Sequence, residues 1–202
     1  GNSLVCVEVK SRGEPSFLGC TVSHGHAGGI LVHDSGAGVF EDCNVFGHKL
    51  GCVEVRSNGS PRLLRCKIHS GQACGVVSHN GGLGTFVDCE IYNSAFANVE
   101  IKSCASPTLT SCVIRNGLAS GVFVFEEATG ELSKCTIRDN KLAGLEIKSR
   151  AAPVVAACEI SGSASGGGVF VHEDGAGTLY DCTVWGNKRA NVELKRGGNA
   201  TL

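Results

Sequence analysis

The sequence has no methionine, few aromatic residues and no excess of charge of either sign. Lys and Arg number 18 against 19 Asp and Glu, and aromatic residues make up 5% of the chain. A nearly neutral chain without a basic stripe lacks the electrostatic footprint of nucleic-acid binding. Its apolar runs are far shorter than the roughly 20 residues that span a bilayer. We therefore expect neither nucleic acid nor a membrane as a partner.

The composition also excludes a disordered tail and a small disulfide scaffold. Apolar residues make up 42% of the 202 residues, which is too many for a disordered segment. The 12 cysteines fall below the roughly 8–10% typical of a short disulfide-rich domain. The absence of methionine and a tag-like start at residues 1–3 indicate a single domain, residues 1–202, excised from a longer chain.

Eight cysteines recur at a fixed interval along the whole chain. The interval is 23 residues, except for a last one of 24. These cysteines are Cys20, Cys43, Cys66, Cys89, Cys112, Cys135, Cys158 and Cys182. A β-branched residue stands two positions after each of them, and no segment has helical spacing. A fixed period of this length is the signature of a solenoid, and short β-branched segments bounded by Gly, Asn and Pro predict strands.

The repeat predicts an all-β fold: a right-handed single-stranded parallel β-helix (solenoid) of about nine coils of 23 residues. Successive coils would pair in parallel about 4.8 Å apart. Right-handed crossovers are the overwhelming rule for parallel strands. A leucine-rich horseshoe is the competing fold with a repeat of this length, and it needs a leucine consensus that this sequence lacks.

The cysteine column is interpreted as a stack of small buried hydrophobic side chains. In-register parallel side chains stay about 4.8 Å apart, which exceeds the usual distance between the Cβ atoms of a disulfide. A straight column also cannot give the tetrahedral convergence that a zinc site needs. We therefore expect free thiols, no metal and a cytoplasmic or nuclear protein, where thiols stay reduced.

A second period of 46 residues patterns the outward residues. Charged segments such as VEVKS (7–11) and VEIKS (99–103) alternate with segments such as ILVHDSGAG (30–38) and VFVHEDGAG (169–177). An exposed apolar patch framed by charges is typical of a protein-binding surface, although solvation explains the charged rows equally well. The predicted partner-binding face consists of Leu31, His33, Glu54, Arg56, Val77, His79, Glu100, Lys102, Phe123, Phe125, Glu146, Lys148, Phe170 and His172.

The alternation resembles a known family of repeats. The segments GGILVHDSGAGVFEDC (28–43) and AGLEIKSRAAPVVAAC (143–158) are similar to the parallel β-helix repeats, also called CASH or PbH1 repeats, of the F-box-only ubiquitin-ligase substrate receptors of types ten and eleven. The similarity covers essentially the whole chain, with cysteine where those receptors tend to carry an inward asparagine ladder. The resemblance implies a non-catalytic β-helix that binds a protein or peptide, as a substrate receptor or a related adaptor.

Catalysis by an enzyme of the β-helix class is the competing interpretation. Glycoside hydrolysis needs paired carboxylates, and lyase or epimerase chemistry needs a base beside a neutralising cation. The neighbouring carboxylates here recur with the period, as Asp42, Asp88 and Asp181 do, so solvation explains them. We expect no catalytic residue and no cofactor. The histidines His33, His79 and His172 lie at least two coils apart, on the order of 10 Å, which is too far to share an ion.

Two alternatives stay open from the sequence. One is a polysaccharide-active or carbohydrate-binding β-helix of the lyase or epimerase type, in which Trp185 would stack on a sugar. The other is a structural spacer in a larger assembly. Because the terminal coils carry no capping helix, end-to-end self-association is also expected.

Overall fold

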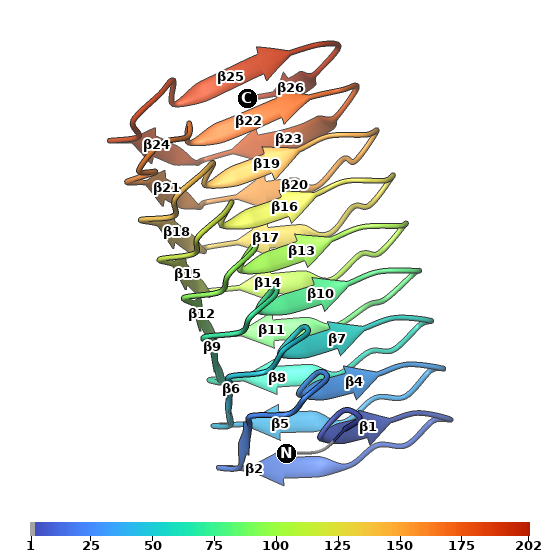
Figure 1. The fold of residues 1–202 in the computed structure, drawn as a ribbon. Coiled ribbons are helices and arrows are strands. Elements are labelled where there is room, and N and C mark those ends of the chain that lie inside the picture. The colour runs from blue at the N-terminus through green and yellow to red at the C-terminus, as the bar shows by residue number, and fades with distance from the viewer. Residues whose placement is uncertain (1–2) are drawn as a thin grey trace.

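The computed structural model describes residues 3–202, in which 26 strands and no helix occur (Figure 1). Gly1 and Asn2, which the predicted domain includes, lie outside the described residues. Each coil except the last contributes one strand to each of three parallel sheets, here named sheets A, B and C. Eight coils have three strands and a ninth has two. The predicted all-β solenoid of about nine coils is confirmed.

Sheet A has nine strands, each paired with the strands of the coils before and after it. They are β1 (Val7–Val9), β4 (Ile30–Val32), β7 (Val53–Val55), β10 (Val76–Ser78), β13 (Val99–Ile101), β16 (Val122–Val124), β19 (Leu145–Ile147), β22 (Val169–His172) and β25 (Val192–Lys195). Their first and third residues point inward, and their central residues form one outward column.

Sheets B and C complete each coil (Figure 1). Sheet B consists of β2 (Ser16–Leu18), β5 (Val39–Glu41), β8 (Arg62–Leu64), β11 (Thr85–Val87), β14 (Thr108–Thr110), β17 (Glu131–Ser133), β20 (Val154–Ala156), β23 (Ala176–Tyr180) and β26 (Asn199–Thr201). Sheet C consists of β3 (Thr21–Ser23), β6 (Asn44–Phe46), β9 (Lys67–His69), β12 (Glu90–Tyr92), β15 (Val113–Arg115), β18 (Thr136–Arg138), β21 (Glu159–Ser161) and β24 (Thr183–Trp185).

The strands are short because residues in the left-handed backbone region turn the chain between them. Asp42 (φ 53°) and Asp88 (φ 53°) separate sheet B strands from sheet C strands, and Asp is one of the residues that tolerate this region. The turn from β16 to β17 places Glu126 (φ 54°) and Glu127 (φ 59°) there in succession. The turn residues therefore set the three-sided cross-section of each coil.

The core is a set of stacked columns inside the three sheets. Phe40 and Phe86 are its largest fully buried side chains. The cysteine column lies at the bend between sheets B and C, and all 12 cysteines are free. Each buried thiol of this column contacts a carbonyl oxygen of the preceding coil, as Cys66 Sγ does with Phe40 O at 3.2 Å. The column is thus a row of thiol hydrogen bonds as well as a row of apolar contacts.

A second inward row is polar and lies at the corner after sheet C. Buried His48 accepts a hydrogen bond from the Gly25 amide at Nδ1 (3.1 Å), and its Nε2 bonds to Val22 O (3.1 Å). Asn140 accepts from the Gly117 amide in the same way, at 2.9 Å. The glycines are required because a Cβ at Gly25 would lie 2.9 Å from His48 Nδ1. This corner position reads Gly25, His48, Gly71, Ser94, Gly117, Asn140, Ser163 and Asn187, so the larger side chain of each neighbouring pair falls in every second coil.

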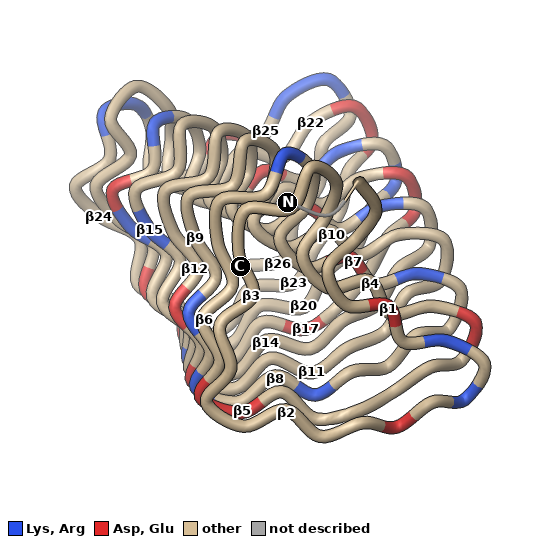
Figure 2. The backbone as a smooth tube through the Cα atoms, turned by 60° about the horizontal axis from the view of Figure 1, so that its bottom comes forward, with Lys and Arg blue, Asp and Glu red and all other residues tan. Residues whose placement is uncertain are grey.

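Charged residues lie on the outside of the coils. Figure 2 shows them gathered along the turns and the outer edges of the stack. Among residues 3–202, no Lys, Arg, Asp or Glu is buried. Within the same range no helix is long and apolar enough to cross a membrane. The functional groups of this protein must therefore be sought on the outer faces.

Candidate functional site

The outer face of sheet A carries an ordered column of alternating chemistry. The central residues of β13 to β25 are in register, so each lies beside its neighbours in the next strands. In chain order they are Glu100, Phe123, Glu146, Phe170 and Glu193. These five side chains form a floor in which carboxylates and phenyl rings alternate.

A second column stands beside this floor, at the corner that precedes each sheet A strand. Large side chains occur in every second coil, at Phe96, Leu142 and Arg189, and the coils between carry Ala119 and Ser165. Phe96 and Leu142 are 60% and 44% exposed. The corner column thus forms a wall with apolar and cationic side chains at regular intervals.

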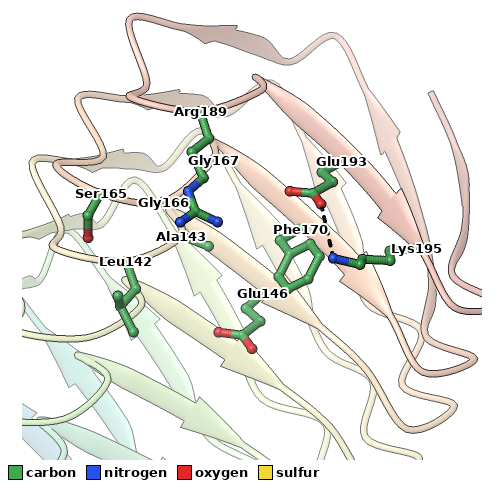
Figure 3. A pocket seen from close by; sticks show the side chains of 10 residues that line it. All are labelled: Leu142, Ala143, Glu146, Ser165, Gly166, Gly167, Phe170, Arg189, Glu193 and Lys195. Carbon is green, nitrogen blue, oxygen red and sulfur yellow. Dashed lines mark ion pairs between the residues drawn. The ribbon is translucent and has the colours of Figure 1, made fainter.

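Floor and wall enclose two adjoining depressions. One, of about 270 Å³, lies between Phe96 and Phe123. The other, of about 300 Å³, lies between Leu142, Phe170 and Arg189 (Figure 3). Leu142 and Glu146 line both, so the depressions form one groove along the stack. We name this feature, from β13 to β25, the sheet A groove.

Glu146 lies where the two depressions meet, and its contacts distinguish it from the other groove glutamates. Its Oε2 accepts a hydrogen bond from the Ser120 hydroxyl at 2.6 Å, and its Oε1 lies 3.2 Å from His172 Nε2. Ser120 and His172 are both buried. The Glu146 carboxylate is therefore held by two side chains that are themselves fixed by packing.

The neighbouring glutamates are instead paired with a cation of their own strand. Glu100 Oε1 lies 2.7 Å from Lys102 Nζ, and Glu193 Oε1 lies 3.9 Å from Lys195 Nζ. Lys148 occupies the corresponding place beside Glu146, but its Nζ lies 3.5 Å from Glu173. Glu146 thus keeps its carboxylate on the groove floor without a lysine or arginine ion pair among the described residues.

The phenyl rings are held by stacking on the next outward side chain of the same strand. The Phe170 and His172 rings have centroids 4.2 Å apart, and those of Phe123 and Phe125 are 4.4 Å apart. Lys148 Nζ lies 5.6 Å from the centroid of Phe123. In Figure 3, Arg189 lies to the left of Phe170 and Lys195 to its right, with Glu146 below. The Glu146 carboxylate, the Phe170 ring and the Arg189 guanidinium therefore line the same depression.

The residues of the predicted partner-binding face lie on the outer face of sheet A, as expected. The structure corrects their exposure in one respect. Leu31, predicted to protrude, is buried, because it lies in register between Glu8 and Glu54. His33 and His172 are buried as well, and their rings turn to the glutamates of the preceding coil.

Only part of that face lines the groove. Glu100, Phe123, Glu146 and Phe170 do. The remaining members lie outside the residues that line the two depressions: Leu31, His33, Glu54, Arg56, Val77, His79, Lys102, Phe125, Lys148 and His172. The predicted face therefore contains the groove floor and extends beyond it toward the N-terminal coils.

Sequence reasoning missed the wall and the serine. The corner column was not connected with the sheet A face, because the distance between them depends on the shape of the turn. Ser120 was not singled out, since a lone serine carries no signal. The signal that could have identified it is its position 26 residues before Glu146, one coil and one short turn away.

Comparison with protein families decides the class of fold. A model described as right-handed β-helix region matches residues 5–151 and 119–202. The chain belongs to the right-handed β-helix family. The predicted hand is thereby confirmed. Among curated protein sequences, none matches this β-helix protein.

Solved structures similar to this β-helix protein are enzymes by name. The A-module of mannuronan C-5 epimerase AlgE6 from Azotobacter vinelandii has a TM-score of 0.74 at 16% identity, over 96% of this chain and 61% of that one. The A-module of epimerase AlgE4 from the same organism has 0.60 at 13%, over 89% and 64%. Pectate lyase Pel9A has 0.59 at 13%, over 86% and 53%. The chain thus spans less than two thirds of each.

These neighbours contradict the prediction of a non-catalytic protein-recognition scaffold. They are an epimerase type and a lyase, both polysaccharide-active, and nothing in the comparisons ties the chain to F-box receptors or to ubiquitin ligation. The prediction that the protein is not an enzyme is wrong on the same finding. That prediction relied on the recurrence of carboxylates every coil or every second coil. A column that recurs in this way can still contain one glutamate with contacts of its own. At these identities the likeness establishes the fold.

Proposed function

We propose that this β-helix protein binds an acidic polysaccharide in the sheet A groove and removes a proton from the sugar carbon next to a carboxylate. The observation that carries the proposal is the constellation at Glu146, in which a carboxylate without a lysine or arginine partner shares one depression with Phe170, Arg189 and Lys195. The sequence resemblance to F-box receptors stays a prediction and has no part in the proposed reaction.

The groove has the shape and lining that a polymer of sugars needs. It is open along the stack and bridges two depressions. Sugar rings present apolar C–H faces, which pack on phenyl rings such as Phe123 and Phe170. Sugar hydroxyls donate hydrogen bonds to the intervening carboxylates.

Each group in the larger depression has a chemical task in proton abstraction. Glu146 accepts the proton, and His172 positions its carboxylate. The electron pair of the broken C–H bond moves toward the sugar carboxylate, where Arg189 and Lys195 stabilise the added negative charge. Transfer of a proton from a solvent water to the opposite face inverts the carbon, and Glu146 then releases its proton to solvent. Expulsion of the glycosidic oxygen on the next carbon, which takes up a proton from water, instead breaks the chain and leaves a double bond.

The test is proton exchange in heavy water. We expect the wild-type protein to incorporate deuterium next to the carboxylate of an acidic polysaccharide, seen by NMR, or to form an unsaturated product, seen by ultraviolet absorbance. Polymannuronate, polygalacturonate and a polymer of alternating glucuronate and N-acetylglucosamine serve as substrates. Glu146→Gln should lower the rate by about 10²–10⁴-fold, since it keeps the shape and removes the base.

Glu8→Gln is the matched control. Glu8 bonds to His33 with the same geometry, at 3.0 Å, but lies in β1, outside the groove. Its substitution should leave the rate unchanged. Equal rates for wild type and Glu146→Gln, or no reaction with any of the three polymers, would contradict the proposal.

A further inference from the structure

The chemical alternation of sheet A extends along the whole stack. The central residue is a glutamate in every second strand and apolar in the strands between, and the register of the sheet places these residues in one column. The apolar members are Leu31, Val77, Phe123 and Phe170. The repeating chemical unit of this face is therefore two coils.

The cations follow the same two-coil rule. Two positions after each glutamate stands Lys10, Arg56, Lys102, Lys148 or Lys195. The apolar coils carry His33, His79, Phe125 and His172 at that place. The three histidine rings bond to the glutamate of the preceding coil, at 3.0 to 3.2 Å, so they are not offered to a ligand. Cationic side chains are thus supplied once in every two coils.

One coil advances the stack by about 4.8 Å. A sugar residue in an extended linear polysaccharide advances its chain by nearly the same distance. A chain lying along the sheet A groove would therefore place successive sugars over successive coils, so that they meet charged and apolar rows in turn.

We infer that the sheet A groove takes a linear polysaccharide in which an acidic sugar alternates with an uncharged one. This inference rests on the proposed function and names the class of substrate. The acidic sugar lies over a row with a cation, such as Glu193 with Lys195. The uncharged sugar lies over Phe123 or Phe170.

A uniformly acidic chain fits this floor less well. Half of its carboxylates would lie over phenyl rings, whose own strands carry no lysine or arginine, and burying an unpaired carboxylate against an apolar surface is costly.

The test compares three hexasaccharides by calorimetry on the Glu146→Gln protein, which binds without turnover. One alternates glucuronate and N-acetylglucosamine, one is oligogalacturonate and one is cellohexaose. We expect the alternating hexasaccharide to bind at least about tenfold more tightly than either of the others, which is the worth of one charge-assisted contact. Tighter or equal binding of oligogalacturonate would overturn the inference.

A second variant tests the register directly. Phe123→Lys adds a cation to an apolar row and should shift the preference about tenfold toward oligogalacturonate. Val154→Lys adds the same charge on the outer face of sheet B, away from the groove, and should leave the preference unchanged. An unchanged preference in Phe123→Lys, with an unchanged melting temperature, would contradict the alternating register.

The two proposals fail in distinguishable ways. If no hexasaccharide binds and no polymer reacts, the proposed function is wrong and this inference falls with it. If polysaccharides bind or react without preference for the alternating chain, only the inference is wrong.

Discussion

At the scale of single residues, the informative positions are those that depart from their own column. His48 is one of them. It stands where Asn140 stands four coils later, and both side chains bond to a glycine amide and to a carbonyl oxygen of the preceding coil. At this corner the backbone presents a glycine N–H and a carbonyl oxygen, and both an imidazole and a side-chain amide can accept from the first and donate to the second. Only the imidazole titrates near neutral pH.

His48 therefore predicts acid sensitivity of folding. Burial lowers the pKa of His48, and the charge of His24 adds to this against the opposing hydrogen bond to Val22. In the unfolded chain the ring takes up a proton near pH 6.5, so between that value and its lower folded pKa the free energy of unfolding decreases as the pH falls. Stability is full above pH 6.5. His48→Asn should reduce this loss, measured as urea midpoints at pH 7.5 and 5.

The control for that experiment is His26→Asn, which changes an exposed histidine. Its pH dependence should match the wild type. If the midpoints of His48→Asn fall with pH as steeply as those of the wild type, burial of His48 is not the source of acid sensitivity.

At the scale of the element, no strand of this protein is stable alone. Most strands have three residues, so each depends on the ladders to the coils before and after it. The cysteine column adds to these ladders from the side. Cys112 Sγ contacts Phe86 O in the preceding coil and Thr110 O in its own, both at 3.5 Å. The thiols thereby couple each bend to the next.

Truncating a thiol should weaken this coupling. Cys112→Ala leaves a cavity in the column and two carbonyl contacts unmade, and it should lower the free energy of unfolding by about 1–3 kcal/mol. Cys104→Ala, at an exposed turn, should change it by less than about 0.5 kcal/mol. Urea unfolding measures both. Equal effects would show that Cys112 in the column contributes no more to the free energy of unfolding than Cys104 in the turn.

At the scale of the whole molecule, the structural repeat is one coil but the packing repeat is two. In the polar corner the larger side chain of each neighbouring pair falls in every second coil, because the small residue between leaves the space. A Cβ at Gly117 would lie 2.7 Å from Asn98 Nδ2 and 3.1 Å from Asn140 Oδ1. The outer face of sheet A follows the same rule. The polar corner inside the coils and the outer face of sheet A therefore share one period of 46 residues.

This period can be tested by deleting coils. Removing residues 54–99 joins Val53 to Glu100 and keeps the alternation, whereas removing 54–76 joins Val53 to Val77 and brings His48 and Ser94 into adjacent coils. Length alone predicts that the longer deletion is the less stable. We expect the opposite order of melting temperatures. A melting temperature that follows the number of coils alone would contradict a two-coil packing unit.

The fold was predictable because its signal is repeated in every coil. Eight cysteines in phase and a β-branched residue after each leave little freedom for another architecture. The groove was not predictable to the same degree. Glu146 and Glu100 stand in similar segments, LEIKS and VEIKS. What separates them is that Ser120 and His172 bond to Glu146, whereas Cys74 and Lys102 contact Glu100. Such a difference depends on three-dimensional contact rather than on pattern.

The alternating floor of the sheet A groove has a kinetic consequence. If a bound chain slid by one sugar, each sugar that had contacted a phenyl ring of the groove would contact a glutamate, and each sugar that had contacted a glutamate would contact a phenyl ring. Sliding by two sugars restores every contact. A polymer would therefore advance past Glu146 in double steps, and successive reactions on one chain would fall on every second sugar, leaving a regular pattern of modified and unmodified units in the product.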